Sequence, residues 1–159
     1  MQQKKHREIQ FYVVLFIIGV MVSGVTAFPV QTGINILAGY KHHFPAPMEQ
    51  WILQLQNGIN ETWFKFPFIA YGTDWLAFAH IMIGVAFIGV YKHPVRNQWV
   101  VQWAIICCIC VIPTAFICGW IRQIPFFHIL IDCSFGVFGL ALLLLIKHKI
   151  TVFKHHIHR

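Results

Sequence analysis

Acidic residues are scarce in this chain: there are five Asp and Glu among 159 positions, and charged residues of both signs make up only 11%. Hydrophobic residues make up 58%, and the mean hydropathy is +0.66. A typical soluble domain has about 25% charged residues, so this composition excludes an ordinary soluble protein. The apolar stretches also lack the alternating polarity of transmembrane β-strands. The sequence therefore predicts an integral membrane protein built from helices.

The sequence also lacks the motifs that would announce a familiar chemistry. It contains no glycine-rich nucleotide loop, no serine-hydrolase elbow and no internal repeat. The net charge of +7 does not indicate a nucleic-acid partner, because the basic residues flank apolar stretches rather than forming a patch with interleaved aromatics. The lipid bilayer is the partner that the composition predicts.

Four apolar stretches are long enough to cross a bilayer, which takes about 20 residues of helix. They cover approximately residues 10–28, 72–91, 98–120 and 125–146. We predict one all-α membrane domain over residues 1–159, a four-helix bundle with an outer cap at residues 29–71 and a tail at residues 147–159. Within the cap, residues 48–59 carry apolar side chains at helical spacing, which predicts a short amphipathic helix.

The basic residues are distributed unevenly around these spans. Nine of the twelve Lys and Arg lie before the first span, between the second and third, or after the fourth. By the positive-inside rule, both termini are expected in the cytoplasm, as in a multi-pass protein of the bacterial inner membrane. The sequence Val25-Thr26-Ala27 resembles a signal-peptidase site, so cleavage after the first span is an alternative to the retained helix that we expect.

The ionisable residues in or beside the last three spans all lie in the predicted outer half: Asp74, His80, Arg122, His128 and Asp132. Such residues are costly in hydrocarbon and usually face protein or water. We therefore predict an outward-facing pocket that binds a small polar ligand or a metal ion. His128 and Asp132 are four positions apart and share one helix face. Arg122 is expected to pair with Asp132 and to keep this carboxylate ionised.

The ligand has several possible identities. His80, His128 and Asp132 supply nitrogen and oxygen ligands suited to zinc, iron or manganese. Haem b is an alternative, because two histidines on facing helices are the usual ligands of membrane cytochromes. However, the depths of His80 and His128 differ by about 6 to 8 Å at helical rise. A quinone-linked oxidoreductase would also suit a pocket at this depth, but the residues specify no reaction.

The polar residues also fit a purely structural role. A buried ionic network that fixes helix packing would use the same side chains. The protein would then be an accessory or structural subunit of a larger membrane complex, or would associate with a second copy of itself. Small residues in the spans suit close helix approach either within the bundle or against such a partner: Gly84, Gly89, Gly136 and Gly139.

Four stretches in and around the second to fourth spans carry a resemblance to known sequences: Tyr71–His80, Pro94–Asn97, Arg122–Pro125 and Leu130–Gly136. Together they resemble a family of small, uncharacterised bacterial inner-membrane proteins. The resemblance covers about half of the chain and implies a four-helix inner-membrane protein, with no activity attached. In the family pattern the position of His128 is commonly a larger basic residue after a tryptophan. The resemblance therefore gives Asp74, His80, Arg122 and Asp132 more weight than His128.

Overall fold

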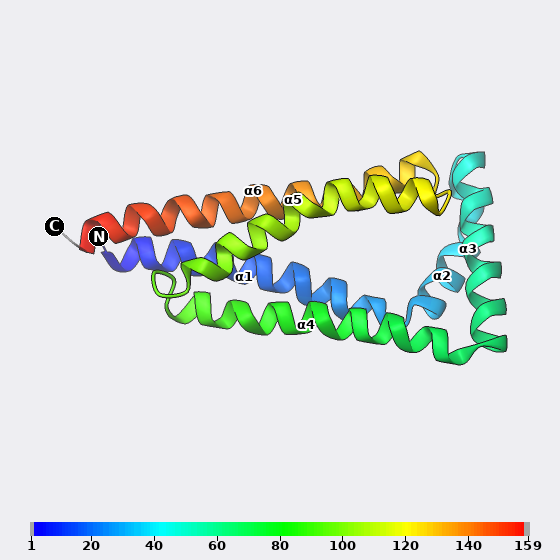
Figure 1. Ribbon diagram of the computed structural model, residues 1–159, viewed down its shortest axis with the longest axis horizontal. Helices are drawn as coiled ribbons and strands as arrows, with labels where there is room; N and C mark the ends of the chain where they lie inside the picture. Colours follow the sequence, from blue (N-terminus) through cyan, green and yellow to red (C-terminus); the bar gives the residue numbers. More distant parts are fainter. Residues whose placement is uncertain (1, 158–159) are drawn as a thin grey trace. The chain divides into compact units, whose positions relative to one another are not determined.

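A computed structural model describes residues 2–157, and this part of the chain is helical with no β-strand (Figure 1). Two 3-10 segments, Lys41–His43 and Pro67–Ile69, separate some of the helices. The α-helices are α1 (Gln2–Ala27), α2 (Val30–Gly39), α3 (Ala46–Lys65), α4 (Ala70–Lys92), α5 (Gln98–Ile121) and α6 (Phe126–Ile157). The prediction of an all-α fold is confirmed.

Four helical segments are long and apolar enough to cross a membrane: Lys5–Ala27, Pro67–Lys92, Gln98–Ile121 and Phe126–Lys154. They correspond to the four predicted spans and support a multi-pass membrane protein. The first and last helices are longer than the apolar stretches predict, since α1 begins at Gln2 and α6 continues to Ile157. At the start of α1, Gln, Lys, Arg and Glu have high helix propensity, so the helix includes the polar flank. The extension of α6 instead contains the fully buried Ile150, so packing accounts for its helical continuation.

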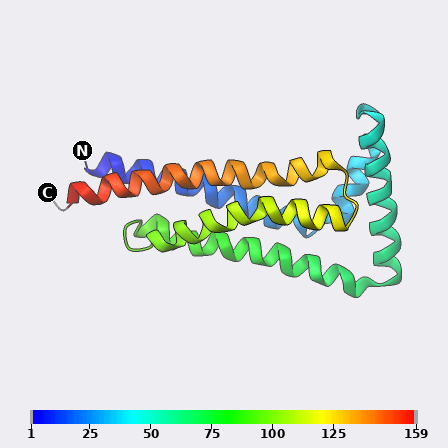
Figure 2. The same cartoon turned by 45° about the horizontal axis from the view of Figure 1, so that its top comes forward.

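Contacts divide the chain into two units, Val20–Ile83 and the combination of Met1–Gly19 with Gly84–Arg159. The division passes through α1 and α4. In the second of these units, α5 and α6 run side by side (Figures 1 and 2). The largest fully buried side chains of this unit come from α1, α4, α5 and α6: Ile9, Val13, Phe87, Val90, Val101, Leu143, Ile146 and Ile150.

The unit of residues 20–83 contains a helical hairpin formed by α2 and α3, which we call the α2–α3 hairpin (residues 30–65; Figure 2). Its small core consists of Ile34, Ala38 and Ile52, with Phe44, Leu55 and Ile59 packed against them. Helix α3 includes residues 48–59, where the spacing of apolar residues predicts an amphipathic helix. Helix α2 is an addition to the predicted elements, because its ten residues are too few to give a clear helical pattern.

Candidate functional site

The turn between α5 and α6 places three of the five predicted site residues. Helix α5 ends in a Schellman motif: the Ile124 amide donates to the Gly119 carbonyl at 2.9 Å, and the Gln123 amide donates to the Trp120 carbonyl at 3.2 Å. Gln123 has a φ of 56°, the left-handed conformation that this motif requires. Pro125 then precedes the first turn of α6. The connection is short and hydrogen-bonded, so it sets the positions of Arg122 at the end of α5 and of His128 in the first turn of α6.

His128 and Asp132 form an ion pair on the first two turns of α6. The His128 Nε2 and Asp132 Oδ1 atoms are 3.9 Å apart, and the two side chains are 34% and 48% exposed. The predicted sharing of one helix face by these two residues is confirmed. A separation of 3.9 Å is too long for a direct hydrogen bond. A third polar atom that lies to one side of the pair can therefore come within hydrogen-bond distance of both the imidazole and the carboxylate.

The expected pairing of Arg122 with Asp132 is wrong for this structure. Among residues 2–157, the ion-pair partner of Asp132 is His128, whereas Arg122 caps the C-terminus of α5 and is exposed. The reason is geometric: Asp132 lies two turns into α6, about 10 Å along the helix from the turn that holds Arg122. Arg122 is therefore an exposed positive charge at the turn between α5 and α6.

Asp74 and His80 both lie on α4, in the unit of residues 20–83, and are half-buried. The Nδ1 atom of His80 is 2.8 Å from the Leu76 carbonyl. Because a carbonyl can only accept, Nδ1 is the donor in this contact, which leaves Nε2 as the nitrogen directed away from the helix backbone. Such an arrangement is common for metal-binding histidines, whose second nitrogen donates to a carbonyl. That His80 and Asp74 share a site with Arg122, His128 and Asp132 stays a prediction.

Helix α1 approaches α4 closely beside His80. A Cβ atom added to Gly24 would lie 2.8 Å from the Ala77 carbonyl oxygen and 3.0 Å from the His80 Cβ. Glycine is therefore required at position 24 for this approach, which holds the backbone of the His80 turn against α1. Sequence patterns gave no sign of this contact, because a glycine within a helical run does not reveal which helix it faces.

No group of three or more His, Cys, Asp or Glu side chains in the described part of the chain is arranged to hold a metal ion. His128 and Asp132 supply two adjacent ligands, and a metal at this position would need others from solvent or elsewhere. The metal set of His80, His128 and Asp132 stays a prediction.

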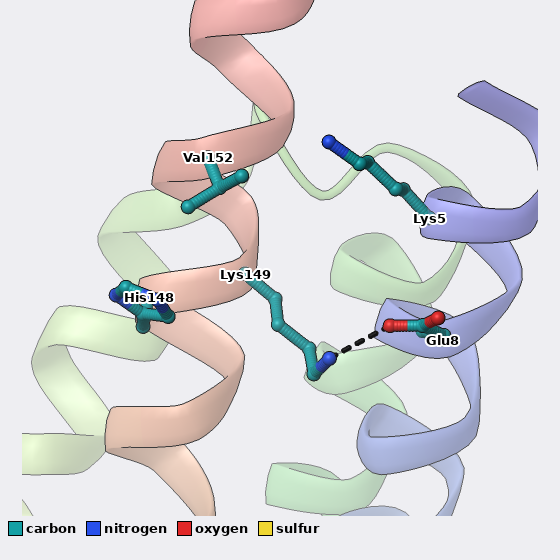
Figure 3. A pocket seen from close by; sticks show the side chains of 5 residues that line it. All are labelled: Lys5, Glu8, His148, Lys149 and Val152. Carbon is teal, nitrogen blue, oxygen red and sulfur yellow. Dashed lines mark hydrogen bonds and ion pairs between the residues drawn. The ribbon is translucent and has the colours of Figure 1, made fainter. Parts of the chain in front are cut away.

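The opposite end of the unit that holds α5 and α6 contains a contact that sequence analysis missed. The Lys149 ammonium donates to the Glu8 carboxylate at 2.7 Å and lies 5.3 Å from the centre of the Tyr12 ring. Lys149 and Glu8 line a pocket of about 180 Å³ together with Lys5, His148 and Val152 (Figure 3). Glu8 is the only acidic residue before α2, which was the available signal for a specific partner.

A second pocket, of about 300 Å³, lies at the same end of this unit and is lined by His6, Lys92, His93, Pro94, Val95, Arg96 and Phe153. None of the five predicted site residues lines either pocket. In the sequence, the basic residues between the second and third spans indicate topology and give no sign of a pocket. The participation of the turn between α4 and α5 in a pocket depends on α1 and α6, which lie far from it in the sequence.

No protein-family model, curated protein or solved structure matches this chain.

Proposed function

We propose that this chain is a multi-pass membrane protein that binds a small polar or anionic ligand, or a metal ion, at the α5–α6 turn. The observation that carries the proposal is the accessible His128 and Asp132 pair, with its 3.9 Å separation, in the largely apolar part of α6 that covers residues 126–146. Retaining an imidazole and a carboxylate in such a helix is costly unless they meet water, protein or a ligand. The proposal assigns binding and no reaction.

The chemistry of His128, Asp132 and Arg122 limits which ligands can bind. Imidazole and carboxylate together offer a hydrogen-bond donor and acceptors, or nitrogen and oxygen ligands for a transition metal. The exposed guanidinium of Arg122 adds a positive charge that attracts anions and can donate two parallel hydrogen bonds to a carboxylate or phosphate. A small molecule with both an anionic and a hydrogen-bonding group fits this combination.

The proposal includes a bacterial inner membrane with both termini in the cytoplasm. The uneven distribution of Lys and Arg supports this orientation. The ion pair between Glu8 and Lys149 also supports it, because it brings the start of α1 and the end of α6 to one end of their unit. The α5–α6 turn, at the other end of α6, then faces outward.

The alternative of an accessory subunit loses part of its support in the structure. Gly136 and Gly139, which would suit packing against a partner, are already used within the chain. A Cβ atom added to Gly136 would lie 3.0 Å from the Cys108 carbonyl oxygen, and one added to Gly139 would lie 3.1 Å from the Cys108 Sγ. These glycines allow α5 and α6 to approach each other and do not require a second protein.

The test is binding by the purified full-length protein in detergent micelles. A visible spectrum and metal analysis first determine whether haem or a metal copurifies. Thermal unfolding is then measured with zinc chloride, manganese chloride, sodium phosphate or sodium acetate added. A ligand at ten times its dissociation constant stabilises the folded state by roughly 1.4 kcal/mol. We expect at least one probe to raise the midpoint of wild-type protein and to leave that of Asp132→Asn unchanged.

Glu61→Gln is the matched control, because it neutralises an exposed carboxylate on α3, which belongs to the unit of residues 20–83 and not to the unit that holds α6. It should retain the full ligand response. His128→Gln provides a second variant if Asp132→Asn does not fold. Absence of any response among the four probes, or an equal response in wild-type, Asp132→Asn and His128→Gln proteins, would contradict the proposal.

A further inference from the structure

Hydrogen bonds from the Asn97 side chain and from the backbone order the turn between α4 and α5. The Asn97 amide group donates to the Gly89 carbonyl at 2.8 Å and to the His93 carbonyl at 3.1 Å. Two backbone hydrogen bonds in the same turn add to this, from the His93 amide to Gly89 and from the Asn97 amide to His93. The residues between 92 and 97 are therefore presented by an ordered backbone, and little entropy is lost when they bind a ligand.

The pocket of about 300 Å³ beside this turn is strongly basic. Lys92 and Arg96 carry permanent positive charges at its exposed rim, and His6 and His93 add two imidazole rings. No acidic residue lines it. The neighbouring pocket differs, since there the Glu8 carboxylate already compensates Lys149. The pocket at the turn thus has uncompensated positive charge for a bound anion.

The pocket also has an apolar side and a fixed position relative to the helix ends. Pro94 is buried, and Val95 and Phe153 complete the lining. The centres of the Phe153 and His6 rings are 5.7 Å apart, and this contact connects α6 with α1. The span-length segments end or begin here, at Lys92 and Gln98 among others. Groups at the ends of transmembrane helices lie at the level of the lipid headgroups, with acyl chains on one side and water on the other.

We infer that this pocket binds the phosphate of an anionic lipid headgroup. Arg96 and Lys92 contact the phosphate oxygens, while His6 and His93 donate to phosphate or to headgroup hydroxyls. Val95 and Phe153 lie against the glycerol and upper acyl region. This assignment is independent of the site proposed at the α5–α6 turn. It is also more specific than general attraction of a basic segment to anionic lipid, because it depends on a pocket with defined lining residues.

Native mass spectrometry of the full-length protein, released from micelles containing dioleoylphosphatidylglycerol or dioleoylphosphatidylcholine, tests the inference. Wild-type protein should retain phosphatidylglycerol in preference to phosphatidylcholine. Each side chain that donates a hydrogen bond to the phosphate contributes roughly fivefold to affinity, so Lys92→Gln combined with Arg96→Gln should weaken phosphatidylglycerol binding roughly 30-fold. Arg96→Gln alone should weaken it roughly fivefold, which keeps the test available if the double variant does not fold.

The matched control combines Arg7→Gln with Lys154→Gln. It removes two positive charges from the same end of the protein, at exposed residues that line neither pocket. This control should bind phosphatidylglycerol within about threefold of wild type, since the two side chains do not line the pocket and the attraction of exposed charges is weakened by salt. Equal losses in the two double variants would show that charge alone attracts the lipid and would overturn the site. Displacement of phosphatidylglycerol by millimolar inorganic phosphate would instead assign the pocket to a soluble anion and overturn the lipid assignment.

Discussion

Two helical hairpins of this protein are held together in different ways. In the α2–α3 hairpin, four amide side chains hydrogen-bond to one another. Asn60 Oδ1 accepts from Gln31 at 2.9 Å and from Asn35 at 3.4 Å, and Asn35 Oδ1 accepts from Gln56 at 3.0 Å and from Asn60 at 2.9 Å. In the hairpin formed by α5 and α6, which we call the α5–α6 hairpin (residues 98–157), glycines admit the neighbouring helix directly.

The difference between the two hairpins follows from their expected surroundings, which are lipid for α5–α6 and water or lipid headgroups for α2–α3. Lipid tails are as apolar as the side chains of α5 and α6, so helix association in a bilayer gains little from burial and depends on close packing. The α2–α3 hairpin has an apolar core on one face and polar amides on another, as expected where one face meets water or headgroups. Larger side chains at the helix contact should therefore destabilise the α5–α6 hairpin, and removal of hydrogen bonds should destabilise the α2–α3 hairpin.

The largest expected effect is that of Gly136→Leu in the α5–α6 hairpin. Even a Cβ atom at position 136 would lie 3.0 Å from the Cys108 carbonyl oxygen and 3.2 Å from Val111 Cγ1, so a leucine must push the helices apart. We expect a loss of about 2 kcal/mol or more in the free energy of unfolding, the usual range for overpacking. Titration of micellar protein with sodium dodecyl sulfate, followed by circular dichroism, measures this loss.

The same substitution at Gly58 of α3 is the control for that experiment. Nothing lies within 4 Å of a Cβ atom added there. Gly58→Leu should be neutral or should stabilise the protein by up to about 0.8 kcal/mol, because leucine has the higher helix propensity. If both variants lose the same stability, the close approach of α5 and α6 at Gly136 is not what distinguishes the two hairpins.

The next effect in size is that of Asn60→Ala in the α2–α3 hairpin. Asn60 takes part in three of the four hydrogen bonds of the amide cluster. These bonds are at most partly buried, so we expect a loss of about 1 kcal/mol rather than their sum. Hydrogen exchange of the full-length protein should show faster exchange in residues 30–65 and unchanged exchange in residues 98–157. Asn57→Ala changes an exposed asparagine on the same helix and should leave both regions unchanged; equal acceleration by the two variants would count against the cluster.

The two hairpins also differ in how far the sequence alone predicts them. The spans of α5 and α6 are predictable because bilayer thickness fixes the length of an apolar helix, and the bounds differ from the prediction by few residues at the turn. Helix α2 was missed because its ten residues are fewer than the stretch of about 11 to 18 residues over which a helical period is recognised. The amide cluster was missed because it joins residues 21 to 29 positions apart, which no periodicity relates.

The candidate site shows the same limit. The contact of His128 with Asp132 follows from helical spacing, and it was predicted. The expected pair of Arg122 and Asp132 required the path of the turn, and the Schellman motif at Gln123 instead keeps Arg122 at the end of α5. The contact of Glu8 with Lys149 spans 141 positions and depends on tertiary packing alone. Spacing within one helix is therefore readable from sequence, whereas contacts across a turn or between helices are not.

A smaller effect of opposite sign is expected at the α5–α6 turn. Gln123 has a φ of 56°, and a left-handed conformation costs a residue with a Cβ atom roughly 1–2 kcal/mol. Gln123→Gly should remove this cost, but glycine also loses more entropy on folding, so the net gain is about 0.5–1 kcal/mol. The same detergent titration measures it. Gln123→Ala keeps the Cβ atom and should give no gain, and a gain of equal size in alanine would contradict the conformational explanation.

The smallest effect is a change in titration on α3. Lys65 donates to Glu61 one turn away, and this hydrogen bond and charge lower the pKa of the fully exposed Glu61 carboxyl below its ordinary value. A lowered pKa gives stability that is present above the unfolded pKa and is lost as the pH falls through the folded one. Carbon-13 NMR of Glu61 should show the lowered value, and Lys65→Met should restore the ordinary one. In 1 M salt the Debye length falls to about 3 Å, so the charge contribution to the difference should shrink if this face of α3 meets water, while the hydrogen bond keeps part of it. A difference that salt leaves undiminished would show that the face is shielded, and the contrast between the two hairpins would then lie in their side chains rather than in their solvent.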